Sequence, residues 1–457
     1  MKAPVVASDQ LINEELLNTV LVTNKRFWML AVLLSTGVFA AVVVVVLLII
    51  NGLSITGFNR PVMWGFYITN FVFWIGISHA GVMISAILRL SQAEWRRPVT
   101  RAAEVLTVFS LLTAMMNPLI HTGRPWRTIY WLFPYDFARG IWPDIRSPFV
   151  WDPSAVFTYL TGSTAFVFIA LVPDFAVIRD RTTGWRHVVY GALALGWRGT
   201  PRQWKLQIVA GVLLSAIILP VFVSVHSIVS WDFAVALVPA WHTTIFAPYF
   251  VIGAVHSGVS AVITMMAAMR WLFKWDNYIT PDHFDSLGRL LIVVASAWFY
   301  FTLLELFFSI FYVESHEIAV WDLRFFQWPY NLMVIVFVFT GYIFPVGLWL
   351  SKRVRRNIVA MFWISIFVNI AMWLERFLII VPGLQYKQAA TFSWGSYMPS
   401  AAEGIFVLGT FCFVGLLLLI FSKFFPLIPL FDIKEGKVLT TEIQVGRVGV
   451  PAVYREE

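Results

Sequence analysis

Residues 76–82 read GISHAGV and residues 253–259 read GAVHSGV, so one order of Gly, His, Gly and Val recurs inside two long apolar runs. A histidine at the centre of a membrane-crossing segment is costly, and it therefore has either a packing or a functional reason. The two copies lie in the second and sixth apolar segments, which cross a membrane in the same direction. The pattern predicts a parallel repeat of two helix bundles.

The composition of the chain is that of a polytopic membrane protein. Hydrophobic residues make up 59% and charged residues 13% of its 457 residues. A run of about 20 apolar residues crosses a bilayer as a helix. The sequence predicts an all-α integral membrane fold with about ten transmembrane spans, at 28–50, 62–88, 102–120, 154–178, 207–229, 242–269, 290–312, 331–350, 357–380 and 402–425.

The repeat and the spans together predict how the chain is divided. Spans two to five and six to nine each form a four-helix bundle, and spans one and ten flank them. The expected parts are an N-terminal segment (1–27), span one (28–50), a first bundle (62–229), a second bundle (242–380), span ten (402–425) and a C-terminal tail (426–457).

The distribution of basic residues predicts the orientation. The even-numbered loops carry more Lys and Arg than the odd-numbered loops, except for the third loop. This places the even loops and both termini in the cytoplasm of a bacterial inner membrane, and the odd loops outside. The net charge of +8 follows from this topology, so we expect membrane lipids and no nucleic acid as partners.

The cysteine content limits the cofactors that this chain can hold. Iron–sulfur clusters need several thiolates, and a covalently attached haem needs the pattern C-x-x-C-H. The chain has one cysteine, Cys412. We therefore expect no iron–sulfur cluster, haem or other metal site in it.

A polar and aromatic region is predicted at the outer face, where span three ends with MMNPLIHTGRPWRTIYWLFPYD (115–136) and span four begins with FVWDPSAVF (149–157). It brings His121 and Asp152 to the same side of the membrane, on either side of a long aromatic loop. Each residue also has a structural explanation, since Asp152 before Pro153 has the pattern of an N-cap followed by proline at N1. Together, a carboxylate and an imidazole beside an aromatic pocket suit deprotonation of a lipid-soluble quinol.

The segment HTGRPWR (121–127), the two G-x-x-H-x-G motifs and the ten spans resemble the membrane subunit of polysulfide reductase and its NrfD-like relatives. The resemblance covers about residues 55–425. Within this family, the sequence is most similar to the larger quinol-oxidising membrane protein of bacterial alternative complex III.

The resemblance implies a function and a set of partners. It implies a subunit that oxidises a quinol, with menaquinol or ubiquinol as substrate, in a respiratory or photosynthetic complex. The implied partners are an iron–sulfur subunit on the outer face, c-type haem subunits and a homologous second membrane subunit. Carried onto this chain, it makes His121 and Asp152 catalytic and adds Arg124, Tyr130 and His226 as quinol-binding residues.

The family also implies polar residues that cross each bundle as a proton path, coupled to proton translocation. In the first bundle these are His79 and Asp174. In the second bundle they are His256, Glu305, Glu375 and Arg376.

Four other interpretations stay open from the residues. His79 and His256 could ligate a haem, or they could serve helix packing alone. The bundle repeat with intramembrane polar residues is also compatible with a secondary transporter. A non-catalytic membrane anchor of a redox complex is the remaining alternative.

Overall fold

The computed structural model describes residues 9–127, 136–142, 146–241, 243–312, 314–387, 392–439, 442–445 and 448–451. Within these residues, 10 helical segments are long and apolar enough to cross a membrane, which confirms the predicted fold class. The spans are formed by α2 (Lys25–Asn51), α3 (Gly65–Ser78) with η2 (Val82–Ile87) and α4 (Leu88–Leu90), α5 (Arg97–His121), α7 (Pro148–Asp180), α9 (Pro201–Ala234), α10 (Phe246–Phe273), α11 (Pro281–Phe311), α13 (Tyr330–Val338) with η6 (Phe339–Ile343) and α14 (Phe344–Trp349), α16 (Ile358–Gln385) and α17 (Ala401–Phe424).

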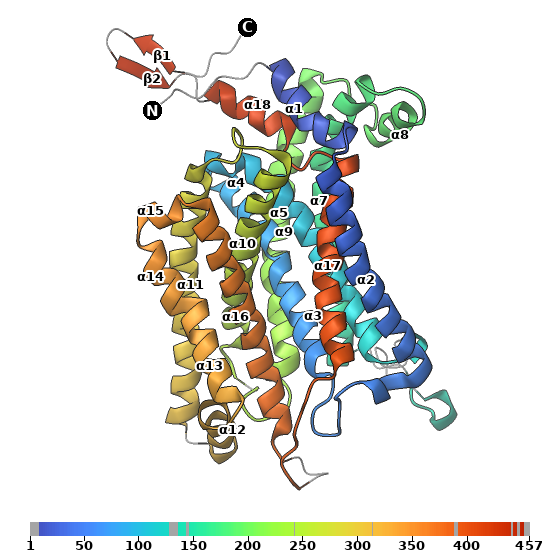
Figure 1. Ribbon diagram of the computed structural model, residues 1–457, viewed down its shortest axis with the longest axis vertical. Coiled ribbons are helices and arrows are strands. Elements are labelled where there is room, and N and C mark those ends of the chain that lie inside the picture. Colours follow the sequence, from blue (N-terminus) through green and yellow to red (C-terminus); the bar gives the residue numbers. More distant parts are fainter. Residues whose placement is uncertain are drawn as a thin grey trace.

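Short elements cover the two ends of the spans. They are α1 (Asp9–Leu21), η1 (Gly52–Ile55), η3 (Glu94–Arg96), η4 (Pro125–Arg127), η5 (Phe137–Arg139), α8 (Trp185–Leu193), α12 (Ser315–Phe326), α15 (Lys352–Arg355), α18 (Leu430–Leu439) and an antiparallel hairpin of β1 (Glu442–Val445) and β2 (Val448–Pro451). We call the end that carries α1, α8 and α18 the terminal face, and the end that carries α12 the opposite face (Figure 1).

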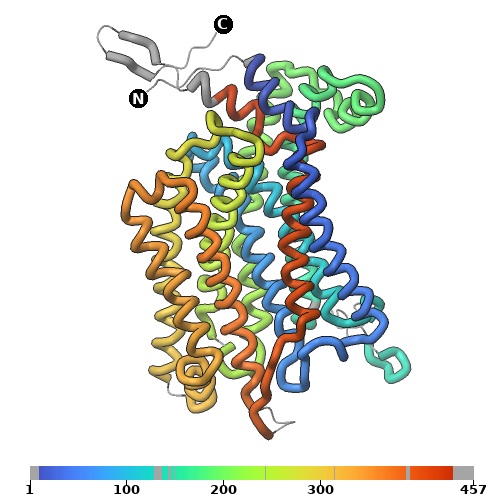
Figure 2. Tube along the Cα trace, in the orientation of Figure 1, coloured from blue at the N-terminus to red at the C-terminus, as the bar shows by residue number. Residues whose placement is uncertain are grey.

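The spans group as the repeat predicts. In the first bundle α3 contacts α5, α5 contacts α7, α7 contacts α9, and α9 returns to η2. In the second bundle α10 contacts α11 and α16, and α16 contacts α13 and η6. The first and last spans, α2 and α17, lie side by side, and α17 packs against α5 and α3 (Figure 2).

One glycine of each repeated motif, Gly76 in the first and Gly258 in the second, lies where the bundles meet, at the crossing of α3 and α10. A Cβ added at Gly258 would lie 2.8 Å from the backbone nitrogen of Ala80, and one added at Gly76 would lie 3.3 Å from Ser257 Oγ. Small residues allow helices in a membrane to approach this closely. These two glycines of the motif therefore serve the seam between the bundles.

The histidines of the motif face away from that seam. His79 is fully buried and contacts Phe222 and His226 of α9, inside the first bundle. His256 is also fully buried, but it stacks on Trp298 of α11 inside the second bundle. The two histidines are thus directed into different bundles.

The C-terminal tail is anchored on the first bundle at the terminal face. Arg97 of α5 pairs with Glu435 of α18 at 2.5 Å, and Arg96 lies 3.8 Å from Asp432. The ring of Phe431, beside Asp432 in the chain, stacks on Trp204 of α9 with centroids 4.0 Å apart. The segment around α18 is therefore a packed part of the molecule.

Candidate functional site

A cavity of 590 Å³ lies at the opposite face, between the ends of the four helices of the first bundle. Among its described lining residues the ionisable side chains are His121, Asp152 and Asp232. The rest of the wall is apolar or aromatic and comprises Met63, Trp64, Ile68, Phe71, Met115, Pro118, Leu119, Pro148, Pro153, Val156, Phe233, Val235, Ala236, Trp241 and Leu384. Such a volume, apolar wall and small set of polar groups are typical of small-molecule sites, which enclose about 300–1,000 Å³.

The imidazole of His121 reaches this cavity from the last residue of α5 and is 2% exposed. Its ring stacks on that of Trp64, with centroids 5.5 Å apart and planes at 23°. Trp64 immediately precedes α3 and has a left-handed backbone with φ of 63°. This conformation costs a non-glycine residue about 1–2 kcal/mol. The backbone is therefore held in an unfavourable conformation at Trp64, the residue on which the imidazole of His121 stacks.

Asp152 enters the cavity from the second turn of α7. The sequence pattern offered Asp152 as an N-cap, but this explanation is wrong, because Ser147 is the N-cap and Pro148 starts the helix. Both Ser147–Pro148 and Asp152–Pro153 have the pattern of a cap followed by proline, and the helix begins at the earlier proline. The carboxyl group of Asp152 is thus not needed to cap the helix.

Asp232, near the end of α9, supplies a second carboxyl group. It lies in hydrogen-bonding contact with the carboxyl group of Asp152. Neither of them forms an ion pair with a described Lys or Arg side chain. Two adjacent carboxylates repel each other in an apolar cavity, so the arrangement favours one proton shared by the pair.

The other residues expected at the quinol site are distributed differently. Arg124 follows α5 in a half-buried turn and is not among the described residues that line the cavity. Tyr130 lies outside the described residues. His226 is six residues before Asp232 on α9, about 9 Å further into the bundle, and it is fully buried there.

His226 instead forms a pair with His79, with ring centroids 4.5 Å apart. The Nδ1–H of His79 donates to the carbonyl oxygen of Ile75 at 2.8 Å. Both ring nitrogens of His226 lack a hydrogen-bond partner among the described residues, whereas the His79 ring also interacts with the backbone of Phe222. Tyr159 also contacts the His79 ring, at 5.7 Å. The middle of the first bundle therefore holds two buried imidazoles in contact, and His226 has free hydrogen-bonding capacity.

Asp174, expected on the proton path, is ion paired near the terminal face. Its carboxylate accepts a hydrogen bond from Arg101 of α5 at 2.9 Å. Arg101 also lies 3.9 Å from Glu104, which accepts a hydrogen bond from Ser85. All three charged side chains are almost fully buried. Arg101 and Glu104 were not assigned from the sequence, although their i, i+3 spacing inside an apolar span is a signal for such a pair.

The polar residues of the second bundle have partners within that bundle, although His256 Nδ1 has none among the described residues. His256 Nε2 bonds the carbonyl oxygen of Gly341 in η6 at 3.1 Å. Glu375 accepts a hydrogen bond from the indole N–H of Trp298 at 2.8 Å and lies 2.7 Å from Arg376. These two charged residues are adjacent in α16. Because neighbouring side chains on a helix point about 100° apart, their positions in the sequence did not predict that they would pair.

Glu305 completes this set near the opposite face. It lies 3.8 Å from Arg324 of α12, and both side chains are buried. Burial lowers the pKa of the Arg324 guanidinium, whereas the nearby Glu305 raises it. Arg324 was not identified from the sequence, because this residue lies in a short helix outside the spans.

Comparison with known proteins places this architecture in a family. Residues 54–387 match the family described as "Polysulphide reductase, NrfD". A protein from Halobacterium salinarum named as a "Putative dimethyl sulfoxide reductase membrane subunit" is 24% identical over 401 residues, which cover 82% of this chain and 86% of that protein. A selenate reductase subunit from Mesobacillus selenatarsenatis is 20% identical over 437 residues, covering 88% and 95%. This chain, with its ten spans and its cavity in the first bundle, belongs to the NrfD polysulphide reductase family.

Proposed function

We propose that this protein is the quinol-oxidising membrane subunit of an electron-transfer complex. The cavity at the opposite face supports this function, because its described wall combines one imidazole and a carboxyl pair with apolar and aromatic surface. A hydroquinone has the complementary chemistry, with an apolar ring and two hydroxyl groups at its ends. The aromatic wall packs the ring, and the polar groups bind the hydroxyls.

The chemistry of the site follows from the protonation of these groups. Oxidation of a quinol to a quinone releases two protons and two electrons. A neutral His121 accepts a hydrogen bond from one hydroxyl, and the charged member of the Asp152–Asp232 pair accepts one from the other. Each then takes a proton as a general base, while both electrons pass to an acceptor outside this chain. The stack with Trp64 fixes the orientation of the imidazole for its hydrogen bond with the quinol hydroxyl.

The names of the relatives support the direction of electron flow. Both are named as parts of a reductase, for dimethyl sulfoxide in one case and selenate in the other. A reductase consumes electrons, and oxidation of a quinol in the membrane supplies them. We therefore propose electron transfer from the quinol, with menaquinol as substrate, to an iron–sulfur subunit docked at the opposite face next to the cavity.

The assembly and its orientation belong to the same proposal. The terminal face lies in the cytoplasm of a bacterial inner membrane, as the distribution of Lys and Arg between the loops favours. The proposed complex is similar to alternative complex III, with c-type haem subunits and a homologous second membrane subunit as further partners.

We also propose that protons move through the first bundle. Asp232, His226 and His79 follow one another from the cavity toward the centre, and both ring nitrogens of His226 lack a described partner. Neutral imidazoles of this kind can relay protons. Asp174 extends the series toward the terminal face. In the second bundle Glu305, Glu375 and Arg376 are held in ion pairs, and His256 has one ring nitrogen without a described partner. We place the main route in the first bundle, because the His79–His226 pair there continues the series from the cavity.

The experiment that tests the function is steady-state quinol oxidation by the assembled complex with a soluble electron acceptor. His121→Ala should lower the rate by about 100-fold, the scale expected for loss of a general base. His187→Ala is the matched control, because His187 is exposed at the terminal face, far from the cavity. An unchanged rate in His121→Ala would contradict the site. Solute uptake by the protein without quinol oxidation would favour a transporter.

A further inference from the structure

A second large cavity lies outside both bundles. It is a groove of 710 Å³ between the α2–α17 pair and the helices α3, α10 and α16. Leu408 and Ile370, on opposite sides of it, are 68% and 48% exposed, so the groove opens sideways onto the surface that faces the bilayer. It is separate from the quinol cavity, since the two share no lining residue.

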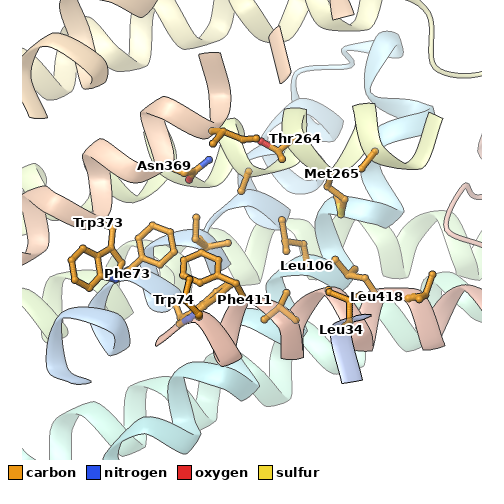
Figure 3. Close-up of a pocket in the computed structure, with 18 of the residues that line it drawn as sticks. Leu34, Phe73, Trp74, Leu106, Thr264, Met265, Asn369, Trp373, Phe411 and Leu418 are labelled. Atoms are coloured by element: carbon orange, nitrogen blue, oxygen red, sulfur yellow. The ribbon is translucent and has the colours of Figure 1, made fainter. Parts of the chain in front are cut away.

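The surface inside the groove consists almost entirely of hydrocarbon and aromatic rings (Figure 3). Most polar groups in its wall bond to other parts of the protein. Thr264 pairs with Ser365 at 2.7 Å, and the indole N–H of Trp74 donates to Thr410 at 2.9 Å. The side-chain N–H of Asn369 donates to the carbonyl oxygen of Ser365 at 2.9 Å. The side-chain oxygen of Asn369 and the indole nitrogen of Trp373 are buried without a described hydrogen-bond partner. A molecule in this groove therefore meets apolar surface, which suits a hydrocarbon chain.

The length of the groove fits a lipid chain that starts at the terminal face. On α17 the wall extends from Gly404 to Leu419, which corresponds to about 22 Å of helix. One leaflet of a bilayer contributes about 15 Å of hydrocarbon. A chain anchored at the terminal face would thus remain in the groove across its whole leaflet.

Two cations stand at the end of the groove on the terminal face. Arg26 lies one helical turn before Leu30 on the same face of α2, and Leu30 and Leu34 line the groove. Lys274 follows Phe273, the last lining residue of α10. Both cations are exposed, and neither forms an ion pair with a described residue. This end of the groove is positively charged where a headgroup would lie.

We propose that the groove is a binding site for an anionic phospholipid. One acyl chain occupies the groove, and the phosphate lies beside Arg26 and Lys274. Basic residues between transmembrane helices at the headgroup level recognise anionic lipids in this way. The bound lipid fills the space between the α2–α17 pair and the second bundle, and so joins them into one membrane-facing surface.

The first test fills the groove. The full chain, with the subunits that purify with it, is reconstituted in mixed phosphatidylcholine–phosphatidylglycerol vesicles and extracted in mild detergent, and retained lipid is counted by native mass spectrometry. We expect phosphatidylglycerol to be retained by the wild-type protein and lost in Ala268→Phe, because Ala268 is an exposed alanine in the groove wall. Ala216→Phe is the matched control, since Ala216 is an exposed alanine of α9 outside the groove.

The second test changes charge without changing packing. Arg26→Gln combined with Lys274→Gln should lower the preference for phosphatidylglycerol over phosphatidylcholine by about 30-fold, the effect of two cations at the membrane surface. Lys352→Gln with Arg353→Gln removes two exposed cations from α15 as the control and should leave the preference unchanged. Equal retention in Ala268→Phe and Ala216→Phe would overturn the proposal, as would an unchanged preference in the charge variant. Recovery of an isoprenoid quinone in place of phospholipid would overturn it as well.

Discussion

Asp152→Asn is the substitution that separates chemistry from structure in the cavity. Ser147, not Asp152, occupies the N-cap position of α7, so the change removes no cap, and the asparagine keeps the shape of the side chain. Loss of a negative charge near a helix N-terminus changes the free energy of unfolding by about 1 kcal/mol or less. Asparagine cannot take a proton from a quinol, however. We expect quinol oxidation to fall by about 100-fold, or about 2.7 kcal/mol in activation free energy.

The contact between the two carboxyl groups sharpens this prediction. Asp232→Asn should give a similar loss, and the double variant should be little worse than either single one, because groups that serve one step fail together. The assay is quinol oxidation by the assembled complex, with assembly checked by the ratio of its subunits. Asp180→Asn, at the other end of α7, is the control and should oxidise quinol normally. Near-normal turnover in Asp152→Asn would refute the role of the pair.

Three further predictions concern the bundles. Gly258→Ala would place a methyl group 2.8 Å from the backbone nitrogen of Ala80. It should lower the free energy of unfolding by about 1–3 kcal/mol in a thermal-unfolding measurement. Gly347→Ala, with open space around it, is the control and should not lower it. Arg101→Met leaves Asp174 without its cation and should cost about 3–5 kcal/mol in the same measurement, with part of the loss recovered by adding Asp174→Asn. His226→Phe should slow proton release per electron in reconstituted vesicles while quinol affinity is retained; unchanged proton release would assign His226 to packing.

The sequence was informative about the number, order and grouping of the spans. Length and hydropathy predict a membrane helix directly, because every polar backbone group in lipid has to be satisfied within the segment. The repeated motif added the grouping into two bundles. The order of the spans also placed His121 and Asp152 near each other, since both positions follow from the direction in which spans three and four cross the membrane.

Contacts between helices could not be predicted in the same way. A span that faces lipid is apolar on all sides, so its sequence does not reveal how the helix is rotated about its axis. This is why the sequence placed His226 at the quinol site, whereas the structure places it against His79, and why Asp232 was not assigned to the site it lines. Trp64 was missed for another reason, because its position depends on a left-handed backbone that no residue pattern indicated.

The most direct test of the quinol site is photolabelling with an azidoquinone that carries its reactive group on the headgroup. The assembled complex is illuminated with this probe, and labelled peptides are identified by mass spectrometry, with excess unmodified quinone as competitor. We predict competed labelling in residues 148–156 and 232–241, which form the wall of the cavity around Asp152 and Asp232. Competed labelling confined to residues 366–374 and 404–419, the walls of the lipid groove, would contradict the proposed quinol site.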